Sequence, residues 1–217
     1  MARLKVAVLI SGRGSNLAAL IEACAAPGFP AEIVTVISNE PDAYGLKRAR
    51  AAGIAATIVN HSAFPSRAEF EAALGEAIRA AGAELVCLAG FMRLLSEGFA
   101  REWRDRLINI HPSLLPAFRG LNTHARMIEA GVRFAGCTVH FVRTEMDAGP
   151  IIVQAAVPVR QDDTPETLAE RTLAAEHRIY PLALRLIAEG RVRVVHEVVH
   201  IDGAAPAEAV VLNPLEA

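Results

Sequence analysis

The sequence predicts an α/β fold: an open, mostly parallel sheet with helices on both faces and an antiparallel strand pair in the C-terminal half. In the first half, short runs rich in Val and Ile alternate with stretches that carry apolar residues at helical spacing. This alternation is typical of parallel strands joined by right-handed helical crossovers. In the second half, two apolar runs follow each other with only a short loop between them. A loop of that length suits an antiparallel connection.

The first half of the chain contains a regular series of predicted strands and helices. Ser66 followed by Glu69 matches a capping box, which predicts the start of the third helix. The first helix has Ser15 or Asn16 as its predicted N-cap. The predicted strands cover 5–10, 32–38, 55–59, 84–89 and 106–110. The predicted helices cover 17–23, 43–52, 67–81 and 97–104.

The second half of the chain predicts antiparallel strands, so that the sheet as a whole is expected to be mixed. A helix is predicted at 123–130, and strands are predicted at 136–142 and 151–158. Because the loop between these strands has no room for a helix, we expect them to be antiparallel. Thr164 before Pro165 is typical of a helix start. From there a long helix is predicted as far as about Glu189, with a kink at Pro181. A small β segment is predicted at 191–201.

Composition narrows the class of protein. With 217 residues, 53% of them hydrophobic, we expect one domain over 1–203 and an irregular tail over 204–217. The net charge of −2 and the 5% aromatic content argue against nucleic-acid binding. No apolar run is as long as a membrane span, and Val6–Ile10 is too short for a signal peptide, so we expect a cytoplasmic protein. The thiols lack CxxC spacing and are expected to be buried and reduced: Cys24, Cys87 and Cys137.

A Gly-rich turn follows the first predicted strand. Its sequence, Ser11-Gly12-Arg13-Gly14-Ser15-Asn16, leads directly into a predicted helix. Glycines let backbone approach a ligand, and the free N–H groups at a helix N-terminus are suited to phosphate. The dinucleotide fingerprint GxGxxG would need Gly at position 17, which is Leu17. The GK[ST] sequence of a P-loop does not occur in this turn either. The turn therefore indicates a single phosphate, with an ordinary tight β–α turn as the alternative.

The centre of the chain carries the sequence Asn109-Ile110-His111-Pro112 at the end of a predicted buried strand. Pro112 favours extended geometry at His111, so the side chains of Asn109 and His111 are expected to point the same way. An amide and an imidazole at a strand end can stabilise an oxyanion. The alternative is a strand-capping Asn and a structural His. His111, His124 and His140 match no metal motif, so no metal is predicted.

Three further features are expected near this strand end. Met92 to Leu95 form an apolar loop after a predicted strand, which suits either a ligand pocket or packing on the core. Arg67 lies at a helix start, where a cation opposes the helix dipole, so a role beyond folding is suspected. Asp147 lies in the antiparallel loop and could reach His111. A carboxylate there would favour the charged imidazole and fix its orientation.

Taken together, these motifs resemble the folate-dependent formyltransferases. The resemblance is carried by Asn109 to Pro116 and by Met146 to Ile152. Val8 to Leu17 and Leu88 to Ser96 are most similar to the members that formylate glycinamide ribonucleotide in purine synthesis. The resemblance extends to about Gly203 and implies the formyltransferase fold. It also implies transfer of a formyl group from 10-formyltetrahydrofolate, as co-substrate, to the amine of that ribonucleotide.

The resemblance implies roles for individual residues. The catalytic trio would be Asn109, His111 and Asp147. The ribonucleotide would be bound by Gly12, Arg13, Gly14, Ser15, Asn16 and Glu176. The folate would be bound by Arg67, Met92, Arg93, Leu94, Leu95 and Asn109, together with the second loop of Arg143, Thr144, Glu145, Met146 and Asp147. Small molecules would be the only partners, with no nucleic acid and no membrane, and the protein would be a monomer or a weak homodimer.

Two departures from the family pattern leave the acceptor less certain than the chemistry. Arg119 stands where Pro is frequent, and Asn122 stands where His is frequent. The alternatives are a formyltetrahydrofolate hydrolase or a formyltransferase for another amine. The chain is expected to be too short for the extra domain that the tRNA formyltransferases or the hydrolase carry. A non-catalytic nucleotide-binding protein would leave the trio without a joint purpose.

Overall fold

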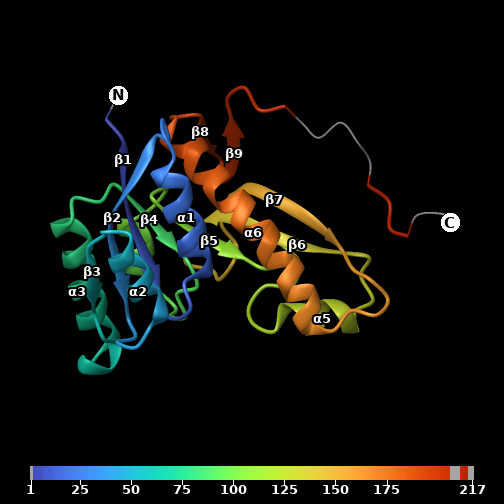
Figure 1. Ribbon diagram of the computed structural model, residues 1–217, viewed down its shortest axis with the longest axis horizontal. Coiled ribbons are helices and arrows are strands. Elements are labelled where there is room, and N and C mark those ends of the chain that lie inside the picture. Colours follow the sequence, from blue (N-terminus) through green and yellow to red (C-terminus); the bar gives the residue numbers. More distant parts are fainter. Residues whose placement is uncertain (1, 206–210, 215–217) are drawn as a thin grey trace.

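The computed structural model describes residues 2–205 and 211–214, and its main feature is a seven-stranded sheet in the order β3-β2-β1-β4-β5-β6-β7 (Figure 1). Strands β1 to β5 are parallel, whereas β6 pairs antiparallel with β5 and β7 antiparallel with β6. The predicted fold class is therefore confirmed. The strands are β1 Leu4–Ile10, β2 Ala31–Ser38, β3 Ala56–Ile58, β4 Leu85–Leu88, β5 Leu107–His111, β6 Phe134–Phe141 and β7 Ile151–Pro158.

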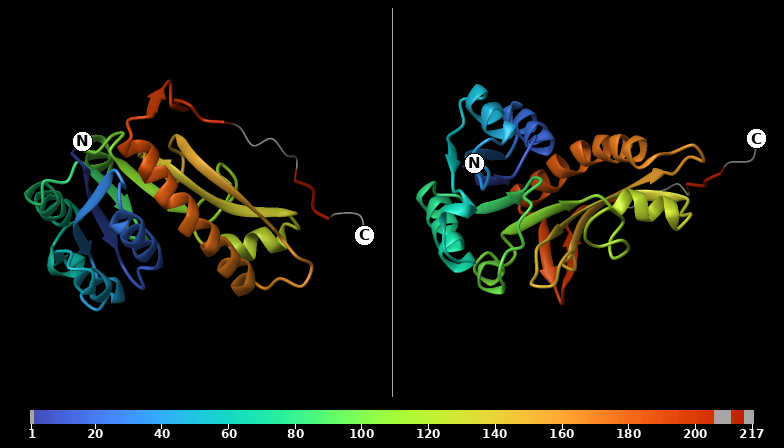
Figure 2. Two further views of the ribbon diagram at one scale, coloured as in Figure 1. Left: turned by 45° about the horizontal axis from the view of Figure 1, so that its top comes forward. Right: turned by 90° about the horizontal axis from the view of Figure 1, so that it is seen from below.

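Helices cover both faces of the sheet (Figure 2). Buried residues of α1, α2 and α6 share one core cluster with alternate strand residues, and those of α3 and α4 share a second cluster on the other face. The smaller helix α5 packs against the start of α6 and against residues of β6 and β7. The helices are α1 Ser15–Ala25, α2 Tyr44–Ala51, α3 Arg67–Ala80, α4 Glu97–Glu102, α5 Thr123–Glu129 and α6 Pro165–Ala188.

The strand order reverses between β1 and β4, because the chain continues outwards through β2 and β3 before returning to β4. Ligands of open α/β sheets bind at such a switch point, outside the carboxyl ends of the strands. The turn after β1 and the loop after β4 meet there. Ser11 N–H donates to the Gly90 carbonyl at 3.1 Å, and Met92 N–H donates to the Ser11 hydroxyl at 2.7 Å.

Several local predictions need correction. Helix α1 has Gly14 as its N-cap, with no side-chain cap, rather than Ser15 or Asn16, because the turn places Gly14 at a φ of 69°. Ser66 caps α3, because its hydroxyl oxygen accepts from the Glu69 N–H. In a full capping box the Glu69 side chain would accept from the Ser66 backbone N–H, but here it accepts from the Ser66 hydroxyl instead. Strand β5 includes His111, one residue beyond the predicted end. A short 3-10 helix at His61–Ala63 was not predicted.

The C-terminal part forms a small hairpin after α6. Helix α6 has a capping box of Thr164 and Thr167 and remains one helix through Pro181. The predicted β segment is a two-stranded antiparallel sheet, β8 Val192–Val195 and β9 Val198–Ile201. The predicted tail lies partly outside the described residues. No helix in the part that the structure describes is long and apolar enough to cross a bilayer.

Candidate active site

The candidate active site is centred on the end of β5. Asn109 and His111 lie two residues apart on this strand. They are on the opposite face from Ile108 and Ile110, which belong to the core cluster shared with α1, α2 and α6. Antiparallel pairing with β6 places His140 directly opposite Asn109. His111 is 6% exposed, so its ring lies in the protein rather than in solvent. The predicted common orientation of Asn109 and His111 is therefore observed.

Asp147 reaches this strand end through a loop that folds back over the sheet. Its Oδ2 lies 3.4 Å from His111 Nδ1, and its Oδ1 lies 3.8 Å from His140 Nε2. The Gly120 N–H donates to the same Oδ2 at 2.9 Å. Gly149 allows the fold-back, because a Cβ there would lie 1.7 Å from the Phe141 carbonyl oxygen. The structure thus brings the three predicted catalytic residues together.

The two nitrogens of His111 face two acceptors. Nε2–H donates to the Phe118 carbonyl at 3.1 Å, and Nδ1 faces the Asp147 carboxylate. A ring protonated on both nitrogens can serve both acceptors, and such a ring can also give up a proton. Phe118 has a φ of 54°, so an unusual backbone conformation directs its carbonyl at the ring. The site therefore holds an orientated imidazole beside a carboxylate.

His140 lies beside the predicted trio but was not among the predicted site residues. Its Nδ1–H donates to the Phe141 carbonyl at 2.9 Å, and burial lowers its pKa, which favours the neutral ring. The free lone pair on Nε2 then faces Asn109 Nδ2 at 3.4 Å. The amide of Asn109 is thereby turned with its nitrogen towards His140. The antiparallel register of the two strands was the missing signal, because strand prediction alone does not fix it.

The Gly-rich turn is pressed against the start of α2. Gly45 N–H donates to the Gly12 carbonyl at 3.0 Å, and a Cβ on Gly14 would lie 2.8 Å from the Gly45 Cα. The first N–H groups of α1 have no partner within the helix, as at any helix N-terminus. This arrangement leaves backbone donors and the positive end of a helix dipole beside the β1 terminus, where an anion can bind.

Glu176 reaches the turn from the other end of the sequence. Asn16 Nδ2 donates to Glu176 Oε2 at 2.7 Å, and both side chains are buried. Burial raises the pKa of the Glu176 carboxyl, although the hydrogen bond from Asn16 acts in the opposite direction. Asn16 Oδ1 is buried without a hydrogen-bond partner among the described residues. Two neighbouring ligand hydroxyls could satisfy both groups, one donating to Asn16 Oδ1 and the other to the Glu176 carboxylate.

The predicted folate residues divide into two groups. Met92, Leu94 and Met146 are exposed apolar side chains, at 70%, 64% and 50%, and exposed apolar surface of this kind marks binding sites. Arg93, Thr144 and Glu145 are also exposed, whereas Leu95 packs against the α3–α4 core. Leu95 therefore anchors the loop to the core and does not contribute to the exposed apolar surface.

Three further arginines, Arg67, Arg119 and Arg143, differ in their surroundings. Arg67 is exposed and lines a groove of about 560 Å³ between α3 and α4. Arg119, at the position that departs from the family pattern, forms an ion pair with Glu145. Arg143 is only 13% exposed in its side chain, because two carboxylates hold its guanidinium. Its predicted contact with the folate stays a prediction.

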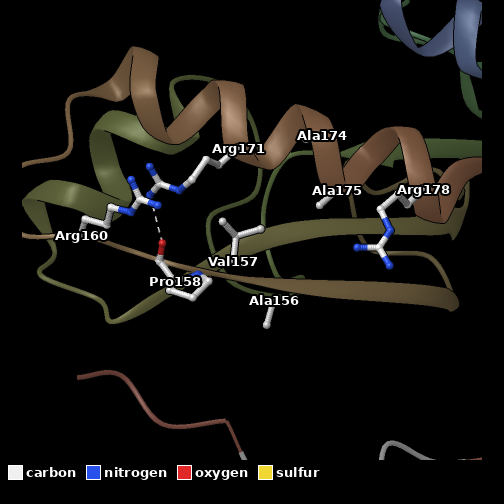
Figure 3. A pocket seen from close by; sticks show the side chains of 8 residues that line it. All are labelled: Ala156, Val157, Pro158, Arg160, Arg171, Ala174, Ala175 and Arg178. Carbon is white, nitrogen blue, oxygen red and sulfur yellow. Dashed lines mark hydrogen bonds between the residues drawn. The ribbon is translucent and has the colours of Figure 1, made fainter. Parts of the chain in front are cut away.

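A second groove, of about 360 Å³, lies between α6 and β7, away from the predicted site residues (Figure 3). Arg171 crosses it to bind the Pro158 carbonyl and the Asp163 carboxylate. This hydrogen bonding holds the pKa of Asp163 well below its usual range. Arg171 therefore has a structural use. No group of three or more potential metal-ligating side chains occurs in the described ranges.

Comparison with known proteins finds similar chains and structures. The family model described as formyl transferase matches residues 4–184. Phosphoribosylglycinamide formyltransferase of Haemophilus influenzae is 43% identical over 201 residues, which cover 93% of this chain and 95% of that protein. The crystal structure of glycinamide ribonucleotide transformylase 1 from Symbiobacterium toebii has a TM-score of 0.89 at 51% identity, and the match covers 92% of this chain and 94% of that one.

Longer relatives also match. The trifunctional purine biosynthetic protein adenosine-3 of Gallus gallus is 53% identical over 192 residues, which are 88% of this chain. This match spans 19% of the trifunctional protein. The chain therefore corresponds to about a fifth of the length of that relative.

Proposed function

The chain belongs to the formyl transferase family, and from this premise we propose that it transfers the formyl group of 10-formyltetrahydrofolate to the amine of glycinamide ribonucleotide in purine biosynthesis. The observation that best supports this proposal is that Asn109, His111 and Asp147 lie together at the end of β5. The turn with free helix N–H groups and the exposed apolar loop meet beside them, at the ends of β1 and β4.

The proposed reaction is direct attack of the ribonucleotide amine on the formyl carbon. A new C–N bond forms, and the carbonyl electrons move to oxygen to give a tetrahedral oxyanion. The donors for this oxygen are the second Asn109 Nδ2–H, beside the one directed at His140, and the His111 Nε2–H, which exchanges the Phe118 carbonyl for the oxyanion. The amine loses a proton, the bond from the formyl carbon to N10 of the folate breaks, and N10 takes up a proton. His111 supplies the general acid, and Asp147, 3.4 Å from its Nδ1, orients its ring.

The remaining residues account for binding. Gly12 to Asn16 provide backbone donors for the phosphate, and Glu176 accepts from the ribose hydroxyls. Met92, Leu94 and Met146 form an apolar surface for the pterin. Arg67, at the groove between α3 and α4, binds the glutamate end of the folate. In this proposal both substrates are small molecules, and 10-formyltetrahydrofolate is the co-substrate.

The test is an incubation of the protein with 10-formyltetrahydrofolate, with and without glycinamide ribonucleotide, followed by the appearance of tetrahydrofolate. Folate product that appears only with the ribonucleotide supports the proposed transfer. Product formed equally without it indicates a hydrolase, and no product in either case contradicts both. Replacing the ribonucleotide by its dephosphorylated riboside tests the phosphate site, because loss of the phosphate contacts should raise KM strongly. The His111→Ala protein, purified in the same way, excludes a contaminating activity.

A further inference from the structure

Arg143 lies at the start of the loop that carries Asp147, and it forms ion pairs with two carboxylates. Its Nη2 donates to Asp105 Oδ1 at 2.6 Å, and its Nε donates to Glu197 Oε2 at 2.6 Å. The other oxygen of Glu197 accepts from Arg104. Asp105 precedes β5 and Glu197 lies at the tip of the β8–β9 hairpin, so two separate elements hold one side chain. We call Arg143, Asp105 and Glu197 the Arg143 clasp.

The backbone at the clasp is unusual. Asp105 has a φ of 57°, and the two-residue turn of the hairpin has φ values of 51° at His196 and 62° at Glu197. Turns of this kind favour Asn-Gly or similar pairs, because residues with a Cβ are strained at positive φ. A Glu in such a position indicates that its contacts maintain the geometry. The contact to Arg143 also holds the pKa of the Glu197 carboxyl below its usual range.

The clasp lies at the base of the loop that carries Asp147. Val142 N–H donates to the Leu107 carbonyl at 2.8 Å, which fixes the chain at the start of β5. From there the loop must fold back along the sheet for Asp147, at a φ of 52°, to reach His111. Only a few residues lie between the fixed base and the carboxylate. The direction in which the chain leaves Arg143 therefore decides where the carboxylate lies.

We propose that Glu197, together with Asp105, is a positioning residue that acts through Arg143 to place the Asp147 carboxylate against His111. The C-terminal hairpin then serves the reaction without contacting either substrate. This inference rests on the proposed formyl transfer. It also explains why Arg143, in a loop expected to contact the folate, points its guanidinium at two protein carboxylates instead.

The test compares Glu197→Gln with wild type. Because a displacement of about 1 Å at a reacting group can reduce rates up to about 10²-fold, we expect kcat to fall roughly 10-fold. KM for the folate should rise, because the same loop borders its proposed site, whereas KM for the ribonucleotide should not change. A merely structural defect would reduce the active fraction and leave both KM values unchanged, which would overturn the proposal. Arg104→Gln is the matched control, because it removes the other partner of Glu197 and leaves Arg143 bound.

A double-mutant cycle with Arg143→Gln tests whether Glu197 acts through Arg143. Glu197→Gln should have no further effect in the Arg143→Gln protein, and an undiminished effect would contradict the proposal. Hydrogen exchange of residues 143–149 provides a readout that does not depend on activity. Exchange should quicken in Glu197→Gln and not in Arg104→Gln. If it quickens while wild type transfers no formyl group, the clasp stands and the proposed function fails; unchanged exchange overturns the clasp.

Discussion

The two ends of the candidate site are built in different ways. The Gly-rich turn after β1 is made of backbone, closed by the contact of Gly14 with Gly45, and belongs to the parallel half of the sheet. The Asp147 end is made of side chains, and its loop is held by ion pairs from Asp105 and Glu197. The first end depends on close packing and the second on charge. Substitutions should therefore affect binding of one substrate at the turn, and the reaction itself at the loop.

The largest effect is expected at the side-chain end. His111→Ala removes the proposed general acid and should lower kcat by roughly 10²–10⁴-fold. The ring is buried, so thermal unfolding must be measured beside steady-state kinetics to show that the protein still folds. A folded His111→Ala protein with wild-type kcat would remove His111 from the mechanism.

Asn109→Ala should have the next largest effect. Loss of one oxyanion donor is expected to lower kcat by about 10²–10³-fold, with little change in KM for the ribonucleotide. His140 supports the amide from β6, so Asn109→Asp, which replaces the donor by an acceptor, should be at least as inactive. Single-turnover rates with both substrates saturating would measure the step. Turnover like that of wild type in Asn109→Ala would contradict the role of Asn109.

The backbone end can be tested with Gly45→Ala. The added Cβ would lie 2.4 Å from Ile10 Cδ1, so this buried side chain must repack beside the turn, whose Gly12 carbonyl oxygen would lie 3.4 Å from the Cβ. Overpacking of this kind costs about 1–3 kcal/mol in unfolding free energy. KM for the ribonucleotide should rise while KM for the folate stays the same. Titration of each substrate separately makes this distinction.

Gly98→Ala in α4 is the control for Gly45→Ala. A Cβ there meets only the Ser96 hydroxyl oxygen, at 3.7 Å, so both KM values should remain those of wild type. An equal rise of both KM values in Gly45→Ala would show that the two ends of the site are not independent.

The smallest effect is a pH-dependent change in stability at Glu176. Because burial raises the pKa of its carboxyl in the folded protein, the unfolded chain releases this proton at a lower pH. As pH rises from the unfolded pKa to the folded pKa, the unfolded state binds fewer protons, so stability falls. Glu176→Gln should therefore have a higher Tm than wild type at pH 8, with the difference shrinking at acidic pH. Glu170→Gln, on the exposed side of α6, should lack this pH dependence.

Most of the fold was predictable, because strands of β-branched residues and amphipathic helices alternate over short, regular distances. The site was predictable where its residues are close in sequence, as with Asn109 and His111 on one strand. Asp147 could be proposed because the loop between β6 and β7 is short. The role of Gly14 as an N-cap depended on a positive φ, which composition alone does not reveal.

The rest of the site depends on contacts that join distant parts of the chain. His140 lies beside Asn109 only in one of two alternating registers, since a shift by one residue would turn its side chain to the other face. The Arg143 clasp unites a residue before β5 with a hairpin tip, 38 residues before and 54 residues after Arg143. Local patterns carry no information about such pairs.

The hydrogen bond between Asn16 and Glu176 has a consequence for synthesis of the protein. Its partners are 160 residues apart, so the turn formed by the first strand and helix is completed only by the last long helix. At ribosomal rates of about 5–20 residues per second, this separation corresponds to a delay on the order of 10 s. During that interval the growing chain can pair its first strands but cannot close the proposed ribonucleotide site around Glu176. If the proposed site is correct, we therefore expect the capacity to bind the ribonucleotide to be acquired late, after α6 has left the ribosome.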